Sequence, residues 1–324
     1  MSASDTNFPS AAATTAQNFD PGLTQTYTGV LNRIVNKNGE FNVRRADARW
    51  TDINPYLFMV NVSWPAFATI VVSAFLIVNI SFAWLYGTIG HVRGAESADR
   101  TTHLLNLFFF SAHTLTTVGY GNMFPDGPLS NLIASLEALT GLMGFAIATG
   151  VLFGRFSRPT ARFGFSSTMV VAPYRDMSGL EFRIVNRRPS SNLIEVNARM
   201  MLMTVETQDG VPSRKYTNLD LEREQVLFLP LTWTVVHPIG DKSPFWGKTA
   251  NDLRRLQAEI VVMMRGYDET FGQNVYARYS YRYDEIEWGR KFGSAFDVDS
   301  QGELILWVDR VSSTVPAPLP EAES

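Results

Sequence analysis

Apolar residues are concentrated in two long runs in the first half of the chain, whereas the second half alternates short apolar and polar stretches. The first run, residues 65–86, contains no charged residue and is bracketed by tryptophans at 64 and 84. The second run, residues 128–153, contains one charge, Glu137. A helix needs about 20 apolar residues to cross a bilayer, and core helices of soluble proteins seldom reach that length without a charge. The pattern predicts transmembrane helices at about 64–87 and 128–156.

Two shorter apolar segments lie in the same half of the chain. Residues 104–115 are too few to span a bilayer, so they predict a re-entrant, interfacial or buried helix. Residues 49–60 set Trp50, Ile53 and Leu57 against polar neighbours, which predicts a helix lying on a membrane surface. Together with the two spans, these segments define a membrane domain at 61–157 preceded by an interfacial helix.

The second half predicts a strand-rich sandwich over residues 166–311, after a linker at 158–165. Short alternating runs are separated there by Gly, Pro, Asn and Asp; examples are 180–185, 193–205, 225–236, 256–264, 274–283 and 303–308. Residues 1–48 are rich in Ser, Ala, Thr, Asn and Gly and predict a segment without a core of its own. Residues 312–324 contain three prolines and predict a disordered tail.

Charge and composition narrow the function classes. A net charge of −3 without any Lys/Arg-dense stripe argues against nucleic-acid binding. The absence of cysteine excludes disulfides, thiolate metal sites and cysteine nucleophiles. Arg44, Arg45 and Arg49 precede the first span, whereas the loop between the spans mixes basic and acidic residues. The positive-inside rule therefore predicts a multi-pass protein with both termini in the cytoplasm.

The sequence Thr117-Val118-Gly119-Tyr120-Gly121 lies between the short apolar segment and the second span. Thr-Val-Gly-Tyr-Gly is the pattern of potassium selectivity filters, in which carbonyl oxygens from four chains replace the hydration shell of the ion. Glycine permits the backbone angles that such a row of carbonyls requires. A Gly-Tyr-Gly segment alone also suits an ordinary turn. The order of span, half-length helix, motif and second span is the one that a re-entrant pore loop needs. We therefore expect potassium to bind at residues 117–120, and Tyr120 to pack behind the filter against Phe108–Phe110.

Further stretches carry a resemblance to one family. The pore segment reads Ser111-x-x-Thr114-x-x-Thr117-Val118-Gly119-Tyr120-Gly121. Other matching stretches are Ser63-Trp64-Pro65, Ala148-Thr149-Gly150, Arg155-Phe156-Ser157-Arg158-Pro159, Phe182-Arg183-Ile184-Val185-Asn186, Leu231-Thr232-Trp233-Thr234-Val235-Val236-His237-Pro238, Asp268-Glu269-Thr270, Ala277-Arg278-Tyr279-Ser280-Tyr281 and Trp288-Gly289. Over residues 45–310 the chain resembles the bacterial branch of the inward-rectifier potassium channels.

The resemblance implies a homotetramer in the bacterial inner membrane, which conducts potassium and carries an immunoglobulin-like cytoplasmic β domain. It also implies roles for particular residues: a gate at Phe153 with a hinge at Gly150; a cavity lined by Phe145, Gly141 and Thr149; filter support from His113 and Thr114; anionic-lipid contacts at Arg49, Arg155, Arg158 and Arg162; and a cytoplasmic ion pathway past Glu195 and Arg265. Ordinary helix packing also suits Phe153, and topology signalling alone also suits the arginines.

Several positions depart from the family pattern. His113 stands where the family usually has a glutamate that braces the filter, so bracing here is expected to depend on pH. Asn122 replaces an acid at the outer mouth, which lowers the cation-attracting charge. Phe145 and Arg265 replace acids of strong rectifiers, so strong polyamine block is not expected. Glu137 either contributes charge to the cavity or pairs behind the filter.

Interpretations from other function classes are weaker. A membrane-anchored sensor with a vestigial pore loop, or a non-selective cation pore, has no need for an intact filter motif. For an enzyme, the best constellation is His237, Asp241 and Ser243, whose spacing matches no catalytic pattern. The histidines at 91, 103 and 113 are not spaced as a metal site. We therefore expect an ion channel rather than an enzyme.

Overall fold

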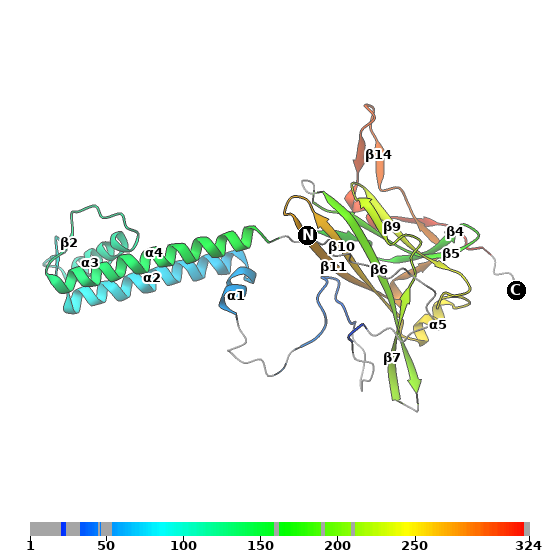
Figure 1. The fold of residues 1–324 in the computed structure, drawn as a ribbon, viewed down its shortest axis with the longest axis horizontal. Coiled ribbons are helices and arrows are strands. Elements are labelled where there is room, and N and C mark those ends of the chain that lie inside the picture. The colour runs from blue at the N-terminus through cyan, green and yellow to red at the C-terminus, as the bar shows by residue number, and fades with distance from the viewer. Residues whose placement is uncertain are drawn as a thin grey trace, which may run out of the picture. The chain divides into compact units, whose positions relative to one another are not determined.

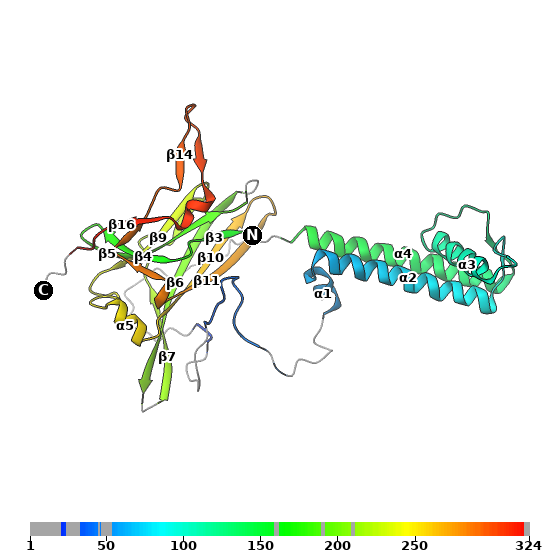
Figure 2. The same cartoon turned by 180° about the vertical axis from the view of Figure 1, so that it is seen from behind.

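The computed structural model describes residues 21–23, 33–44, 46, 54–158, 162–188, 192–208 and 211–320. The chain divides into a helical unit, Arg45–Arg158, and a β-rich unit made from Met1–Arg44 and Pro159–Ser324. Figures 1 and 2 show the elements of each unit from opposite sides.

The helical unit contains two long helices, α2 (Trp64–Ile89) and α4 (Pro128–Phe156), with the shorter α3 (Arg100–Leu115) beside them (Figure 1). Both long helices are long and apolar enough to cross a membrane. A short helix, α1 (Pro55–Asn61), precedes α2, and strands β1 (Val92–Arg93) and β2 (Phe124–Pro125) pair at the other end of the unit. Residues 49–53 of the expected interfacial helix lie outside the described residues.

Helix α3 begins one turn before the predicted residue 104. Asp99 accepts a hydrogen bond from the Thr102 backbone N–H and thereby caps the helix at its N-terminus. The prediction from apolar residues places the start of the helix too late, because the first turn, residues 100–103, is polar. The helix packs against its neighbours through Leu107 and Phe110, and the Phe110 ring meets the Tyr86 ring of α2 edge-on at 5.0 Å.

Most other apolar side chains of α2 and α4 are exposed in the single chain. Among them are Ile77, Ile80, Leu136, Leu142, Phe145 and Ile147. Exposed apolar faces of this size are costly in water and suit contact with lipid or with further copies of the chain.

The β-rich unit contains two five-stranded sheets. The first has the order β11 (Gln273–Arg282), β10 (Glu259–Asp268), β6 (Leu193–Gln208) and β7 (Val211–Leu219), with β8 (Gln225–Phe228) also pairing with β6. The second has the order β12 (Ile286–Trp288), β4 (Met169–Tyr174), β5 (Met177–Asn186) and β3 (Phe163–Phe165), with β9 (Thr232–Ile239) also pairing with β5. The β12–β4 pair is parallel and the other pairs of these sheets are antiparallel.

One hydrophobic core joins the two sheets. Leu180, Phe182 and Ile184 project from β5 towards side chains of the other sheet such as Val262 and Tyr281. Helix α5 (Ala250–Arg255), held by a capping box between Thr249 and Asp252, contributes Leu253 to the same core. The predicted fold class, two membrane-spanning helices followed by a β-rich sandwich domain, is confirmed.

The prediction of disorder over residues 312–324 is wrong for its first part. Residues Thr314–Pro316 form β16, which pairs with β13 (Arg290–Phe292), and the Ala317 N–H donates to the Gly289 carbonyl at 2.8 Å. Arg290 donates to both the side-chain and backbone oxygens of Thr314. Prolines are tolerated here because a two-stranded edge does not need every N–H. A 3-10 helix (Val308–Ser312) precedes β16, and β14 (Phe296–Val298) pairs with β15 (Leu304–Leu306) as a hairpin.

The described N-terminal residues pack on the β-rich unit. The Ile34 N–H donates to the carboxylate of Glu259, and the Ser280 hydroxyl donates to the Val35 carbonyl at 2.7 Å. Ile34 and Val35 are buried against Met203 and Tyr216. Arg33 and Lys37 both pair with the carboxylate of Glu285. The sequence predicts that this segment has no core of its own. In the structure, its residues 34 and 35 are buried against the surface of a sheet.

Candidate functional site

The motif at residues 117–121 follows directly from the C-terminal end of α3. Thr117, Gly119 and Gly121 have φ of +59°, +57° and +83°, whereas the residues between them are not in the left-handed region. A backbone that alternates between left- and right-handed residues turns successive N–H groups to one side. The carbonyl groups can then gather on the opposite side, which is what coordination of a bare cation requires.

Thr117 is strained, because a β-branched residue rarely adopts a positive φ. The strained turn is held by backbone hydrogen bonds to the end of α3. The Thr117 N–H donates to the Thr114 carbonyl at 3.0 Å, and the Val118 N–H donates to the His113 carbonyl at 2.9 Å. The end of α3 therefore controls the shape of the loop.

Tyr120 packs against His113, not against the phenylalanines of α3. The two rings meet edge-on, with centroids 4.8 Å apart and an interplanar angle of 89°. Within one copy, the Phe110 ring faces Tyr86 and Phe108 packs on Phe109, so packing of Tyr120 against Phe108–Phe110 stays a prediction for the assembled channel. Thr114, the other expected filter support, bonds through its hydroxyl to the Phe110 carbonyl one turn earlier.

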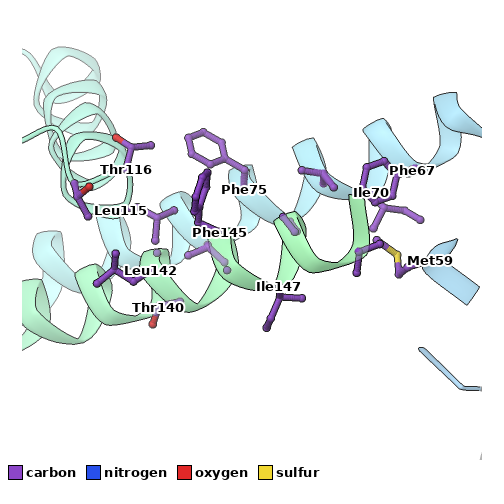
Figure 3. A pocket seen from close by; sticks show the side chains of 18 residues that line it. Met59, Phe67, Ile70, Phe75, Leu115, Thr116, Thr140, Leu142, Phe145 and Ile147 are labelled. Atoms are coloured by element: carbon purple, nitrogen blue, oxygen red, sulfur yellow. The ribbon is translucent and has the colours of Figure 1, made fainter. Parts of the chain in front are cut away.

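A cavity of about 840 Å³ lies beside the filter loop, between α2, α4 and the end of α3 (Figure 3). Two of the expected cavity residues, Gly141 and Phe145, line it together with Leu115 and Thr116, and Thr149 is not among the lining residues. The Phe145 side chain is 76% exposed in the single chain. The described lining carries no acidic residue, so this wall of the cavity is uncharged.

Glu137 does not contribute to the cavity. Its side chain is fully buried, and its two carboxyl oxygens accept hydrogen bonds from the hydroxyl groups of Tyr86 (2.8 Å) and Ser111. Of the two alternatives that the sequence left open, charge in the cavity or pairing behind the filter, these contacts favour pairing, with Tyr86 of α2 and Ser111 of α3 as the partners.

Phe153, the expected gate, lies on α4 with 73% of its side chain exposed. At Gly150, the expected hinge, an added Cβ would meet no atom within 4 Å. Next to Phe153, α4 contacts α1: a Cβ on Gly154 would lie 2.2 Å from the Tyr56 hydroxyl oxygen. A larger residue at position 154 would therefore have to displace the Tyr56 side chain.

Arg155 joins α4 to the end of α1. Its guanidinium donates to the carbonyl groups of Met59 (2.5 Å), Val60 (3.2 Å) and Val62 (2.8 Å). It also lies over the rings of Trp64 and Phe67, at 4.5 and 4.8 Å from their centroids. Carbonyls at the end of a helix lack intrahelical partners and carry partial negative charge, which a cation neutralises.

The other expected lipid contacts differ in their surroundings. Arg158 is exposed and donates to the Asn61 side chain, and Arg162, on the β-rich unit, is also exposed. Arg49 lies outside the described residues.

The expected cytoplasmic pathway residues lie on neighbouring strands. Glu195 adopts φ of +49° beside a break in the β6–β10 register, and Arg265 faces Asn197 across the same pair of strands. A bulge at this point re-aims the side chains. Both side chains are exposed, and Arg265 donates to Asn274 at 3.3 Å.

The geometry at His237 does not support a catalytic triad. His237 is buried between Ser243, whose hydroxyl lies 2.8 Å from Nε2, and the backbone carbonyl of Asp220, 2.6 Å from Nδ1. The carbonyl takes the place that the carboxylate of a triad would occupy. Burial lowers the pKa of His237, which suits a neutral structural imidazole. Within the described part of the chain, no cluster of three metal-ligating side chains occurs.

Comparisons with known proteins cover both units. Residues 67–158 match the family model of ion channels, and residues 163–323 match that of the inward rectifier potassium channel C-terminal domain. The inward rectifier potassium channel Kirbac3.1 of Paramagnetospirillum magnetotacticum is 38% identical over 85% of this chain and 92% of its own length. The human G protein-activated inward rectifier potassium channel 3 is 30% identical over 82% of this chain and 74% of its own length.

Proposed function

Because this chain belongs to the inward rectifier potassium channel family, we propose that four copies form one pore in which residues Thr117–Gly121 select potassium. Members of this family are ion channels and not enzymes, and potassium is the ion conducted. The observation that carries the proposal is the alternation of φ at Thr117, Gly119 and Gly121. A filter of this kind needs carbonyl oxygens of four copies to face the ion path, and glycine at positions 119 and 121 permits the positive φ that this arrangement uses.

A homotetramer accounts for the exposed apolar surface of the helical unit. One copy supplies one quarter of a ring of carbonyls and one wall of a cavity. The outward-facing side chains of α2 and α4 then contact lipid or neighbouring copies. Phe145, exposed in one copy, would line the shared cavity beneath the filter together with its equivalents.

The gate is a ring of four Phe153 side chains, which blocks ions by excluding water from an apolar constriction. Arg155 supports this role, because it ties the α1 carbonyls to α4 two residues after Phe153. A displacement of α1 along the membrane surface would thus be transmitted to the gate. The β domain acts on the gate through the linker at 158–165.

Both termini lie in the cytoplasm, and anionic lipid bound at the inner surface modulates the gate. Arg158 and Arg162 are the described candidates for contact with a lipid headgroup, because both side chains are exposed. Arg155 binds the end of α1 instead of a lipid headgroup, because its guanidinium already donates to three carbonyls there. The uncharged cavity wall and Arg265 in the cytoplasmic path favour weak block by polyamines.

Potassium-gradient-driven uptake of 86Rb into liposomes containing the purified chain tests the proposal. We expect uptake that barium abolishes, that sodium does not compete away and that Gly119→Asp eliminates. Uptake that persists in Gly119→Asp would place the ion path elsewhere. No uptake across several lipid compositions would argue for a vestigial pore and direct attention to the β domain.

A further inference from the structure

Four polar residues form a buried group inside the membrane-spanning part of the chain. Glu137 of α4, Ser111 of α3 and Asn79 of α2 are fully buried, and Tyr86 of α2 is 1% exposed. Ionisable side chains within transmembrane segments are rare because they are costly to bury, and they usually serve a function. This group lies apart from the filter loop and the cavity lining already described.

The group joins three helices through a continuous set of hydrogen bonds. Tyr86 donates to one oxygen of the Glu137 carboxyl, and the Ser111 hydroxyl contacts the other. The Ser111 oxygen also lies 3.2 Å from the backbone carbonyl and 3.1 Å from the side-chain oxygen of Asn79. The Asn79 amide nitrogen donates to the Phe75 carbonyl at 2.7 Å, which turns the side-chain oxygen towards Ser111. Each helix is thus bound to the other two through Glu137 and Ser111.

A second contact lies one helical turn further along. Gly141 follows Glu137 by four residues, and Leu115 follows Ser111 by four, so each pair shares one face of its helix. A Cβ on Gly141 would lie 1.9 Å from the Leu115 carbonyl oxygen. The backbone of α4 therefore touches the last residue of α3, and only glycine permits this approach.

The two contacts fix the last turn of α3 in position and rotation. Glu137 holds the turn at Ser111, and Gly141 holds it at Leu115, two residues before Thr117. The same turn supplies the carbonyls of His113 and Thr114 that hold the strained loop. A displacement of this turn would consequently move the filter.

We propose that Glu137 is a positioning residue, whose carboxyl holds α3 against α2 and α4 and thereby sets the preference of the filter for potassium over sodium. This inference rests on the proposed function. It explains how the chain dispenses with an acid at position 113, where the imidazole instead contacts Tyr120 through its ring edge. The bracing carboxyl comes from α4 in place of α3.

The permeability ratio of sodium to potassium, from reversal potentials of the purified full chain in planar bilayers, tests the proposal. We expect Glu137→Leu and Ser111→Ala each to raise the ratio about tenfold, because each removes a hydrogen bond that holds α3 and leaves a buried polar group without that partner. Glu137→Gln is expected to stay within about twofold of wild type, because its amide supplies both an acceptor for Tyr86 and a donor for Ser111. Ser135→Ala is the matched control, since Ser135 is exposed on α4 and its hydroxyl donates to the Asn131 carbonyl of its own helix.

Each outcome has a separate meaning. A wild-type chain without potassium preference would contradict the proposed function itself. The role of Glu137 would be overturned if wild type is selective and the Ser111→Ala and Glu137→Leu variants assemble as tetramers with the same permeability ratio as wild type. The proposed function would then still stand. If Glu137→Leu does not assemble, Ser111→Ala and Tyr86→Phe test the role of Glu137 in its place. Each of these variants removes one hydroxyl group and nearly preserves the shape of the side chain.

Discussion

Replacing Glu181 with glutamine should remove a pH dependence from the stability of the β-rich unit. Glu181 lies in the middle of β5, 9% exposed, between Val170 of β4 and Val236 of β9. Burial raises the pKa of its carboxyl to about 7, and the nearby Arg183 guanidinium opposes that rise in part. Arg183 is itself held by the Thr234 hydroxyl and the Gly293 carbonyl, so its charge stays in place beside the carboxyl.

The sign follows from proton binding in the two states. The carboxyl of the unfolded chain titrates near 4.5 and that of the folded chain near 7. Between these values the folded state holds more protons, so the free energy of unfolding falls as pH rises through the window. From pH 5 to pH 8 the loss is about 2 to 3 kcal/mol.

Amide hydrogen exchange of the full chain, followed by mass spectrometry of peptides covering Met177–Asn186, measures this loss once intrinsic exchange rates are corrected. Through Glu181, wild type should lose about 2 to 3 kcal/mol of protection between pH 5 and pH 8, and Glu181→Gln should lose less than wild type by that amount; burial also raises the pKa of Glu259 on β10, whose contribution remains in both proteins. Glu206→Gln is the control, because Glu206 is exposed and pairs with Lys215 at the surface. Equal pH dependence in wild type and Glu181→Gln would refute the assignment.

Three further predictions concern the gate and its connections. Arg155→Lys should speed hydrogen exchange in α1 by about tenfold, because one ammonium cannot replace a planar guanidinium bonded to three carbonyls; unchanged exchange would contradict the anchoring role. Phe153→Ala should raise potassium flux several-fold by widening and wetting the constriction, and an equal or lower flux in correctly assembled protein would argue for simple packing. Glu285→Gln should speed exchange in residues 33–43 without affecting β10, because Arg33 and Lys37 both pair with that carboxylate; equal exchange in both proteins would show that the burial of Ile34 and Val35 alone holds the segment.

The sequence predicts the two spans well because their signal is local. An uncharged apolar run of bilayer length is seldom anything but a membrane span, and α2 and α4 begin at the predicted residues 64 and 128. Strand prediction is weaker where the pattern is polar. β7 (Val211–Leu219) was not predicted, because its edge position tolerates Ser, Arg and Lys between the apolar residues.

Proline accounts for another difference. The run 225–236 reads as a single strand, but the structure ends β8 at Phe228 and starts β9 at Thr232. Pro230 lies between them and has no N–H to give to a sheet. The two strands then join different sheets, which a run of apolar residues alone does not indicate.

Residues that act through distant partners are the hardest to assign. Glu137 meets Tyr86 and Ser111 from 51 and 26 residues away. From the sequence it follows only that a lone acid in an apolar span needs a partner or water. Arg155 was expected to bind lipid from its place at the end of a span, yet the carbonyls of α1 surround it. Its partners lie 93 to 96 residues earlier in the chain, at α1 and its C-terminal end, so this contact could not be predicted from the sequence.

The reversal potential of currents through the wild-type chain in a planar bilayer, with potassium on one side and sodium on the other, tests the central claim most directly. If residues Thr117–Gly121 select potassium, the potential should lie beyond about 59 mV in the direction that potassium sets, which corresponds to at least a tenfold preference. Gly119→Asp should abolish the current. A potential near zero, or a current that survives Gly119→Asp, would contradict the account.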